Sequence, residues 1–149
     1  MKTFIWISIF LAAFSFMEFM AWFTHKYIMH GFLWNLHRDH HKKDHGSKFE
    51  RNDAFFVFYA LIGMLLFWLG SQTSFWYGWP LGSGITAYGA TYFLVHDIFI
   101  HQRFKLFKNT NTRYIKGIRR AHKMHHKHLD RENGKCFGML AVPFKYFRK

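Results

Sequence analysis

The stretch FIWISIFLAAFSFMEFMAWFTHKYIMH, residues 4–30, joins an apolar run directly to a pair of histidines. The run from Phe4 to Phe23 carries a single charge, Glu18. A helix that rises about 1.5 Å per residue needs about 20 residues to cross the bilayer core, which is the length of this run. A secretory signal peptide is the alternative, and it is disfavoured because no small-residue cleavage site follows the run. The stretch therefore predicts a transmembrane helix that ends in histidines.

Two more apolar runs follow. Residues 54–70 contain no charge, and residues 81–95 are uncharged and rich in glycine, alanine and serine. Small residues allow helices to approach closely in lipid, and a homodimer through this last run is left open. Aromatic residues with Pro80 and Gly82 between the runs indicate an interfacial turn. We expect about three transmembrane helices, with spans at about 4–23, 54–72 and 81–100.

The charge distribution orients these spans. The 149-residue chain has 21 Lys and Arg against 8 Asp and Glu, a net charge of +13. Apart from Lys2, every basic residue lies within residues 26–51 or 103–149. Three spans place both blocks on one side of the membrane, which the positive-inside rule makes the cytoplasm. This segregation excludes a soluble nucleic-acid-binding module. The sequence predicts an all-α integral membrane protein, with one domain over residues 1–149.

The polar parts are expected to hold the functional residues. Histidine-bearing helix extensions would occupy the cytoplasmic regions 25–51 and 96–149, with short interfacial helices forming a cap. A single cysteine, Cys136, excludes an intrachain disulfide and a multi-thiolate metal site. Histidine is the abundant residue instead, with 12 copies. The chemistry of the protein is therefore expected to rest on imidazole.

Ten of these histidines repeat one scheme twice. An i, i+5 pair is followed by an i, i+3, i+4 triplet, first in residues 25–41 and again in residues 96–126. The triplet positions share one face of a helix, so three imidazoles can reach one point. The paired positions lie about 140° apart on a regular α-helix. They need a local distortion, a helix end between them, or two ions on either side of the helix.

Ligand type and number indicate two metal ions. Ten imidazoles exceed what one ion binds and suit two ions with about five ligands each. Imidazole binds zinc, iron, copper and nickel, so the ligand type alone does not name the metal. Against a zinc-buffering protein or a transporter, the histidines gather on one side and form no ladder of ligands along a span.

The motifs HKYIMH (25–30), HRDHH (37–41), HDIFIH (96–101) and HKMHH (122–126) resemble the four histidine boxes of the fatty-acid hydroxylase superfamily, which includes sterol desaturases. Together with ENGKCFGMLAVP (132–143), they are most similar to the bacterial non-haem β-carotene hydroxylases. The resemblance implies a membrane-bound di-iron monooxygenase of the bacterial inner membrane, with its metal site on the cytoplasmic side. It implies hydroxylation of the β-ionone rings of β-carotene at C3, giving β-cryptoxanthin and zeaxanthin. A fatty-acid or sterol hydroxylase or desaturase is the alternative.

The same resemblance assigns cofactors and ligands. It implies two iron ions, O2 as co-substrate and electrons from a ferredoxin-type donor, while zinc could replace iron in purified protein. No catalytic residue is expected beyond the metal ligands. The ten expected ligands are His25, His30, His37, His40, His41, His96, His101, His122, His125 and His126.

Several other residues have expected roles around that site. Asp39, Asp44 and Asp97 are candidates to accept hydrogen bonds from ligating histidines. Glu18 is expected to hydrogen-bond a neighbouring helix, with polarisation of a ligand as the alternative. His45 and His128 lie outside the pattern and are expected to be surface residues or to support the metal ligands without binding metal themselves.

The expected partners are a lipid-soluble carotenoid, membrane lipids and an acidic electron-donor protein. The basic stretch 113–127 could dock that donor or contact anionic headgroups.

Overall fold

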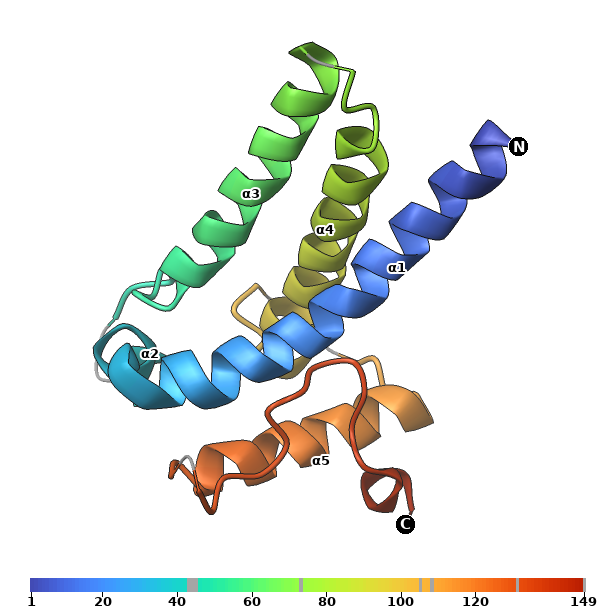
Figure 1. Ribbon diagram of the computed structural model, residues 1–149. Coiled ribbons are helices and arrows are strands. Elements are labelled where there is room, and N and C mark those ends of the chain that lie inside the picture. Colours follow the sequence, from blue (N-terminus) through green and yellow to red (C-terminus); the bar gives the residue numbers. More distant parts are fainter. Residues whose placement is uncertain (43–45, 73, 105, 108, 131, 149) are drawn as a thin grey trace. The chain divides into compact units, whose positions relative to one another are not determined.

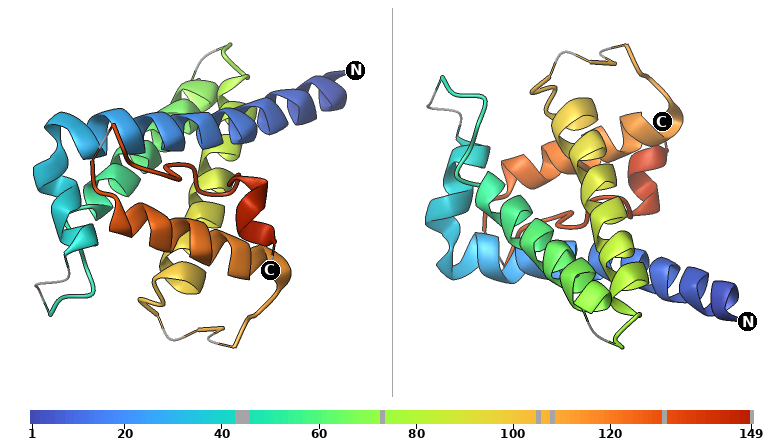
Figure 2. Two further views of the ribbon diagram at one scale, coloured as in Figure 1. Left: turned by 90° about the horizontal axis from the view of Figure 1, so that it is seen from below. Right: turned by 90° about the horizontal axis from the view of Figure 1, so that it is seen from above.

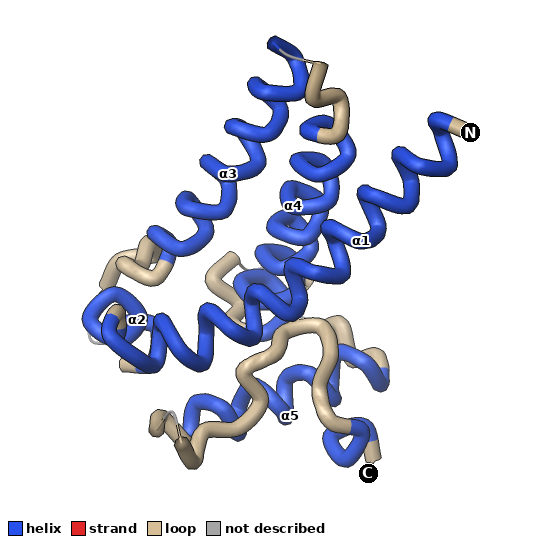
Figure 3. Tube along the Cα trace, viewed as in Figure 1, coloured by secondary structure: helices blue, strands red, loops and turns tan. Residues whose placement is uncertain are grey.

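The computed structural model describes residues 1–42, 46–72, 74–104, 106–107, 109–130 and 132–148. In these residues all regular secondary structure is helical, which confirms the all-α prediction for them (Figure 3). Three short elements are not α-helical: η1 and η2 are π-helices and η3 is a 3-10 helix. The elements in chain order are α1 Lys2–Phe23, η1 Thr24–Phe32, α2 Trp34–His41, α3 Asp53–Gln72, α4 Gly78–Phe93, η2 Leu94–Ile100, α5 Arg113–Lys127 and η3 Phe144–Phe147.

The chain divides into two compact units. One consists of Met1–Met17 and Asp53–Thr91, and the other of Glu18–Asn52 and Tyr92–Lys149. The first holds most of α1, α3 and α4, and the second holds all the described histidines. That residues 1–149 form one functional domain stays a prediction.

Glycines set the packing of the first unit, in which α3 and α4 run alongside each other (Figure 1). A Cβ atom on Gly84 of α4 would lie 2.6 Å from the carbonyl oxygen of Phe10 in α1. A Cβ on Gly82 would lie 3.0 Å from the carbonyl oxygen of Gly63 in α3. Both distances are too short for a side chain, so the helices contact backbone to backbone.

Large apolar side chains remain on the outside of α1 and α3. Phe4 is 75% exposed and Met64 is 64% exposed. Among the described residues, two helical stretches are long and apolar enough to cross a membrane, Lys2–Phe32 and Asp53–Gln72. The third predicted span is divided, because α4 ends at Phe93 after 16 residues and η2 continues the helix to Ile100.

The core of the second unit forms where η2, α5 and the C-terminal segment meet. Val95, Ile115, Ile118 and Met139 are buried together there. The Thr112 side chain caps α5 by accepting a hydrogen bond from the backbone N–H of Ile115. After α5 the chain folds back along the helix to η3, and its described residues in between have no regular secondary structure (Figure 2). This arrangement brings the carbonyls of Leu129, Lys135 and Phe137 beside histidines of the same unit.

Candidate metal centre

The two π-helices bring the two histidines of each i, i+5 pair close together. His25 and His30 both lie in η1, and His96 lies in η2 with His101 directly after it. A π-helix has hydrogen bonds from residue i+5 to residue i, so positions five apart come close to alignment. The ring centroids of His25 and His30 are 5.2 Å apart, and those of His96 and His101 are 4.6 Å apart. Of the three arrangements that the sequence left open, the local distortion is observed in both pairs, and in the second pair the helix also ends between the two histidines.

The triplets lie on ordinary α-helices, as predicted. Those at residues 37–41 and 122–126 are in α2 and α5. All ten histidines converge in the second unit, and nine of them fall into two groups whose ligand atoms lie within 4.8 Å of one another. We call His25, His30, His37, His41 and His125 cluster A, and His40, His101, His122 and His126 cluster B.

The tenth histidine, His96, joins cluster B. Its Nε2 lies 3.2 Å from Nε2 of His40. The two clusters adjoin each other, with ring centroids 4.3 Å apart between His41 and His126. Each cluster contains histidines from both halves of the repeated scheme, since His125 of the second half completes cluster A and His40 of the first half belongs to cluster B.

In cluster A the outer nitrogens of four imidazoles are hydrogen-bonded to neutral oxygens. His25, His30 and His125 donate from Nδ1 to the backbone carbonyls of Phe137, Leu129 and Lys135, at 3.0, 2.7 and 3.1 Å. His37 donates from Nδ1 to the side-chain oxygen of Asn52 at 2.7 Å. In cluster B the acceptors are carboxylates: His40 donates to Glu50 at 2.8 Å and His96 to Asp97 at 3.3 Å.

These outer hydrogen bonds decide the state of the inner nitrogens. A carbonyl oxygen can only accept, so a neutral His30 or His125 carries its proton on Nδ1 and leaves Nε2 as a bare lone pair. The two Nε2 atoms nevertheless lie 3.2 Å apart. Two lone pairs face each other in the same way between the Nε2 atoms of His25 and His37, which are 3.1 Å apart, and between those of His40 and His96, which are 3.2 Å apart.

A cation between the lone pairs would remove this repulsion. Neighbouring Nε2 atoms lie 3.2 and 2.9 Å apart in cluster A and 2.7 and 2.8 Å apart in cluster B, close enough for one ion to bind several of them. The donor set, its tautomers and its spacing therefore fit two imidazole-bound metal ions.

Burial keeps these imidazoles neutral, as metal ligands must be. Loss of solvent lowers the pKa of His37 to about 3, although its hydrogen bond to Asn52 opposes the shift. Burial, and then repulsion from the neighbouring His30, lowers the pKa of His125 to about 2. In cluster B, burial followed by repulsion from His96 lowers the pKa values of His40 and His122 well below the usual range.

The three aspartates singled out in the sequence have different positions. Asp97 accepts a hydrogen bond from His96 and also forms an ion pair with Arg103. Asp39 instead accepts from the backbone N–H of Arg51 at 2.6 Å. Asp44, like His45, lies outside the described residues. His128 belongs to neither cluster and caps the C-terminus of α5.

Sequence reasoning missed several of the acceptors. Glu50 and Asn52 accept from cluster histidines, and their only signal in the sequence is that they closely follow the HRDHH motif. The carbonyls of residues 129, 135 and 137 carry no signal, because every residue has a carbonyl. For Glu18 a neighbouring helix was the expected partner, and its carboxylate accepts hydrogen bonds from the backbone of residues 139–141, which lie in a loop.

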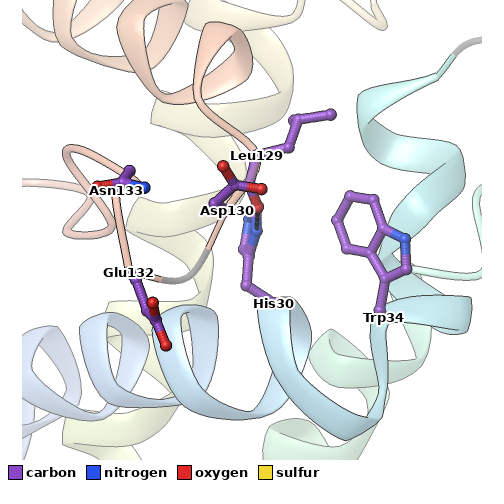
Figure 4. A pocket seen from close by; sticks show the side chains of 6 residues that line it. All are labelled: His30, Trp34, Leu129, Asp130, Glu132 and Asn133. Atoms are coloured by element: carbon purple, nitrogen blue, oxygen red, sulfur yellow. Dashed lines mark hydrogen bonds between the residues drawn. The ribbon is translucent and has the colours of Figure 1, made fainter.

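A polar cavity of about 570 Å³ reaches cluster A at His30 (Figure 4). Trp34 forms one wall, with its ring centroid 5.2 Å from that of His30. The cavity is lined by His30, Trp34, Leu129, Asp130, Glu132 and Asn133. Cluster A is thus accessible from a side that carries carboxylate and amide groups.

Comparison with known proteins agrees with this site. The family model described as fatty acid hydroxylase matches residues 10–144, which include all ten clustered histidines. The chain belongs to the fatty acid hydroxylase family. No solved structure matched the chain.

The chain is similar in sequence to several named proteins from bacteria and plants. The chain is 42% identical over 130 residues to a beta-carotene hydroxylase of Pantoea ananas, which covers 85% of this chain and 71% of that protein. It is 41% identical over 127 residues to a beta-carotene hydroxylase of Pseudescherichia vulneris, covering 83% and 69%. It is also 36% identical over 132 residues to a chloroplastic beta-carotene 3-hydroxylase of Arabidopsis thaliana, covering 85% of this chain and 42% of that protein.

Proposed function

We propose that this member of the fatty acid hydroxylase family is a β-carotene 3-hydroxylase that depends on two iron ions and O2. The product of the first reaction would be β-cryptoxanthin, and that of the second zeaxanthin. The observation that carries the proposal is the convergence of ten imidazoles in two adjoining clusters. The names of the similar bacterial and plant proteins supply the substrate.

Cluster A would hold one iron, and cluster B together with His96 the other. Iron held there would supply redox chemistry: with O2, two electrons and two protons, a C–H bond would become a C–OH group, and the second oxygen atom would leave as water. Zinc would occupy the same imidazoles without supplying electrons.

The protein's own residues prepare the site. The acceptors at Nδ1 fix the imidazoles that donate to them, those of His25, His30, His37 and His40 among them, in one tautomer and one orientation. Burial of His37, His40 and His125 keeps bulk water away from the inner nitrogens. The polar cavity beside His30 would be the route for water-soluble reactants, whereas a hydrocarbon substrate would enter from the lipid.

The membrane arrangement belongs to the same proposal. Three spans, the third made of α4 and η2, would leave both basic blocks and the histidine clusters on the cytoplasmic side of the bacterial inner membrane. Helices α5 and η3, with the segment between them, would form a cap over the clusters. Two apolar stretches of sufficient length and the exposed apolar side chains of α1 and α3 support this arrangement.

An acidic electron donor of the ferredoxin type would dock on α5. Five basic side chains of this helix are exposed at a spacing of three or four residues, so they form a single stripe: Arg113, Lys116, Arg120, Lys123 and Lys127. Anionic headgroups could occupy the same stripe. A homodimer through α4 has less support, since Gly82 and Gly84 already contact α3 and α1 of the same chain.

Pigment analysis tests the function directly. The chain would be expressed in bacteria that already make β-carotene, with His125→Ala as the inactive variant. We expect carotenoids that have gained one or two oxygens, and none with the variant. Unchanged β-carotene, with iron-loaded protein present in the membranes, would contradict the substrate and redirect the search to fatty acids and sterols.

A further inference from the structure

The Glu18 carboxylate is held by three consecutive backbone amides. Its Oε1 accepts from the N–H groups of Met139, Leu140 and Ala141 at 3.0, 2.9 and 2.9 Å, and its Oε2 accepts again from Leu140 at 3.1 Å. A carboxylate in an otherwise apolar helix is costly, and these donors compensate for the cost. The contact fixes one short segment of chain, residues 135–141, to the end of α1. We call this segment the strap.

The other end of the strap orients two members of cluster A. The carbonyl of Phe137 accepts from His25 and the carbonyl of Lys135 accepts from His125. The Phe137 ring also packs against both imidazoles, with centroid distances of 5.6 and 5.1 Å. Only Gly138 separates Phe137 from Met139, so the amides that bind Glu18 and the carbonyls that orient the histidines belong to one continuous piece of backbone.

The local sequence allows this close contact. A Cβ on Gly138 would lie 2.9 Å from the carbonyl oxygen of Ala141 and 3.3 Å from Oε1 of Glu18. Glycine is therefore the residue that lets the backbone turn tightly around the carboxylate. On its other side, the strap is held by the hydroxyl of Tyr114, which donates to the carbonyl of Leu140 at 2.8 Å.

We propose that Glu18 is a positioning residue for cluster A: its carboxylate fixes the strap so that the Phe137 and Lys135 carbonyls hold His25 and His125 with Nε2 turned inward. The proposal rests on the metal site of the proposed function. Glu18 has no positioning role for cluster B in this proposal, because the described Nδ1 acceptors on that side, Glu50 and Asp97, lie outside the strap.

A cobalt(II) titration of the detergent-purified, metal-free chain tests the proposal, since the absorption spectrum of bound cobalt reports its ligand geometry. Glu18→Leu removes every acceptor and does not hinder membrane insertion, because leucine is the more apolar residue. We expect about tenfold weaker binding of one of the two cobalt equivalents, as when an outer partner of a ligand is lost, and an unchanged second equivalent. A general loss of structure would weaken both.

Two further variants sharpen the test. Glu18→Gln keeps an oxygen at the Oε1 position, which makes three of the four contacts, so its affinity should lie between those of the wild type and Glu18→Leu. Ser15→Leu makes a similar polar-to-apolar change at an exposed position of the same helix and should bind as the wild type does. Hydrogen exchange of the strap amides is measured in parallel and should accelerate in Glu18→Leu.

The outcomes separate the inference from the proposed function. Faster exchange of the strap with both cobalt equivalents bound normally would contradict positioning by Glu18 alone. Equal weakening of both equivalents would also contradict it. A wild-type chain that binds no cobalt would contradict the metal site, and the inference would fall with it.

Discussion

At the scale of single residues, the two clusters differ in what their imidazoles donate to. Four histidines of cluster A donate to carbonyl or amide oxygens, whereas His40 and His96 on the cluster B side donate to Glu50 and Asp97. A carboxylate makes the imidazole a stronger electron donor to a metal than a neutral oxygen does. The two clusters are therefore chemically unequal, although the histidine boxes are nearly symmetric in sequence.

The Glu50 carboxylate should matter for metal affinity. Glu50→Gln keeps an oxygen that can accept from His40 but removes the negative charge, so we expect cluster B to bind cobalt about 10-fold to 100-fold more weakly. Asp53→Asn is the matched control, because it makes the same carboxylate-to-amide change at the start of α3, in neither cluster. Competition with a chelator measures both affinities, and equal values for the two variants would contradict a role of the charge.

Acid should destabilise the metal-free protein. The pKa of His37 is lowered to about 3 in the folded state, against 6.5 in the unfolded chain. As the pH falls below about 6.5, the unfolded chain therefore binds a proton that the folded chain does not, and stability decreases until about pH 3. Burial lowers the pKa values of His40 and His122 in the same direction.

The thermal unfolding midpoint, measured in detergent at pH 7.5 and pH 5, checks this expectation. It should be lower at pH 5. An equal or higher midpoint at pH 5 would show that these histidines are not buried in the neutral form.

At the scale of helices, most of the architecture followed from patterns along the chain. The long apolar runs predicted α1 and α3, and the i, i+3, i+4 triplets predicted the helical faces of α2 and α5. The i, i+5 spacing required a distortion or one of two alternatives, and η1 and η2 are that distortion. Periodicity predicts such features because it depends only on local geometry.

The acceptors around the clusters could not be predicted in this way. Phe137 lies 112 residues after its donor His25, and the accepting atom is a backbone carbonyl, which no residue type marks. Glu18 was noticed as an unusual charge in an apolar run, but its partners are amides more than 120 residues away. Contacts of this kind depend on how the whole segment folds back, which local sequence patterns do not encode.

The helix contacts of the first unit give a test at this scale. Gly84→Ala places a Cβ 2.6 Å from a backbone oxygen of α1, and it should destabilise the protein by about 1–3 kcal/mol. Gly89→Ala in the same helix meets its nearest neighbour, the Phe56 ring, at 3.7 Å, and it should be neutral or slightly stabilising. Unfolding midpoints of the two variants should differ accordingly; equal midpoints would contradict the close packing of α1 and α4.

At the scale of the whole molecule, the charge segregation predicts which parts face the cytoplasm. In a Cys136→Ser background, Ser74→Cys lies between α3 and α4 and should react with a membrane-impermeant maleimide on intact cells. Lys127→Cys at the end of α5 should react only after the cells are permeabilised. Labelling of both positions from outside would contradict the proposed orientation.

We expect the clustered histidines to hold metal ions with which oxygen from O2 is transferred to a carotenoid. Growth of β-carotene-producing bacteria under 18O2, followed by mass analysis of their pigments, tests this claim most directly. We predict hydroxylated carotenoids with one 18O per new hydroxyl from the wild type and from His128→Ala, and none from His125→Ala. Hydroxyl oxygen derived from water, or unchanged product formation by His125→Ala, would contradict it.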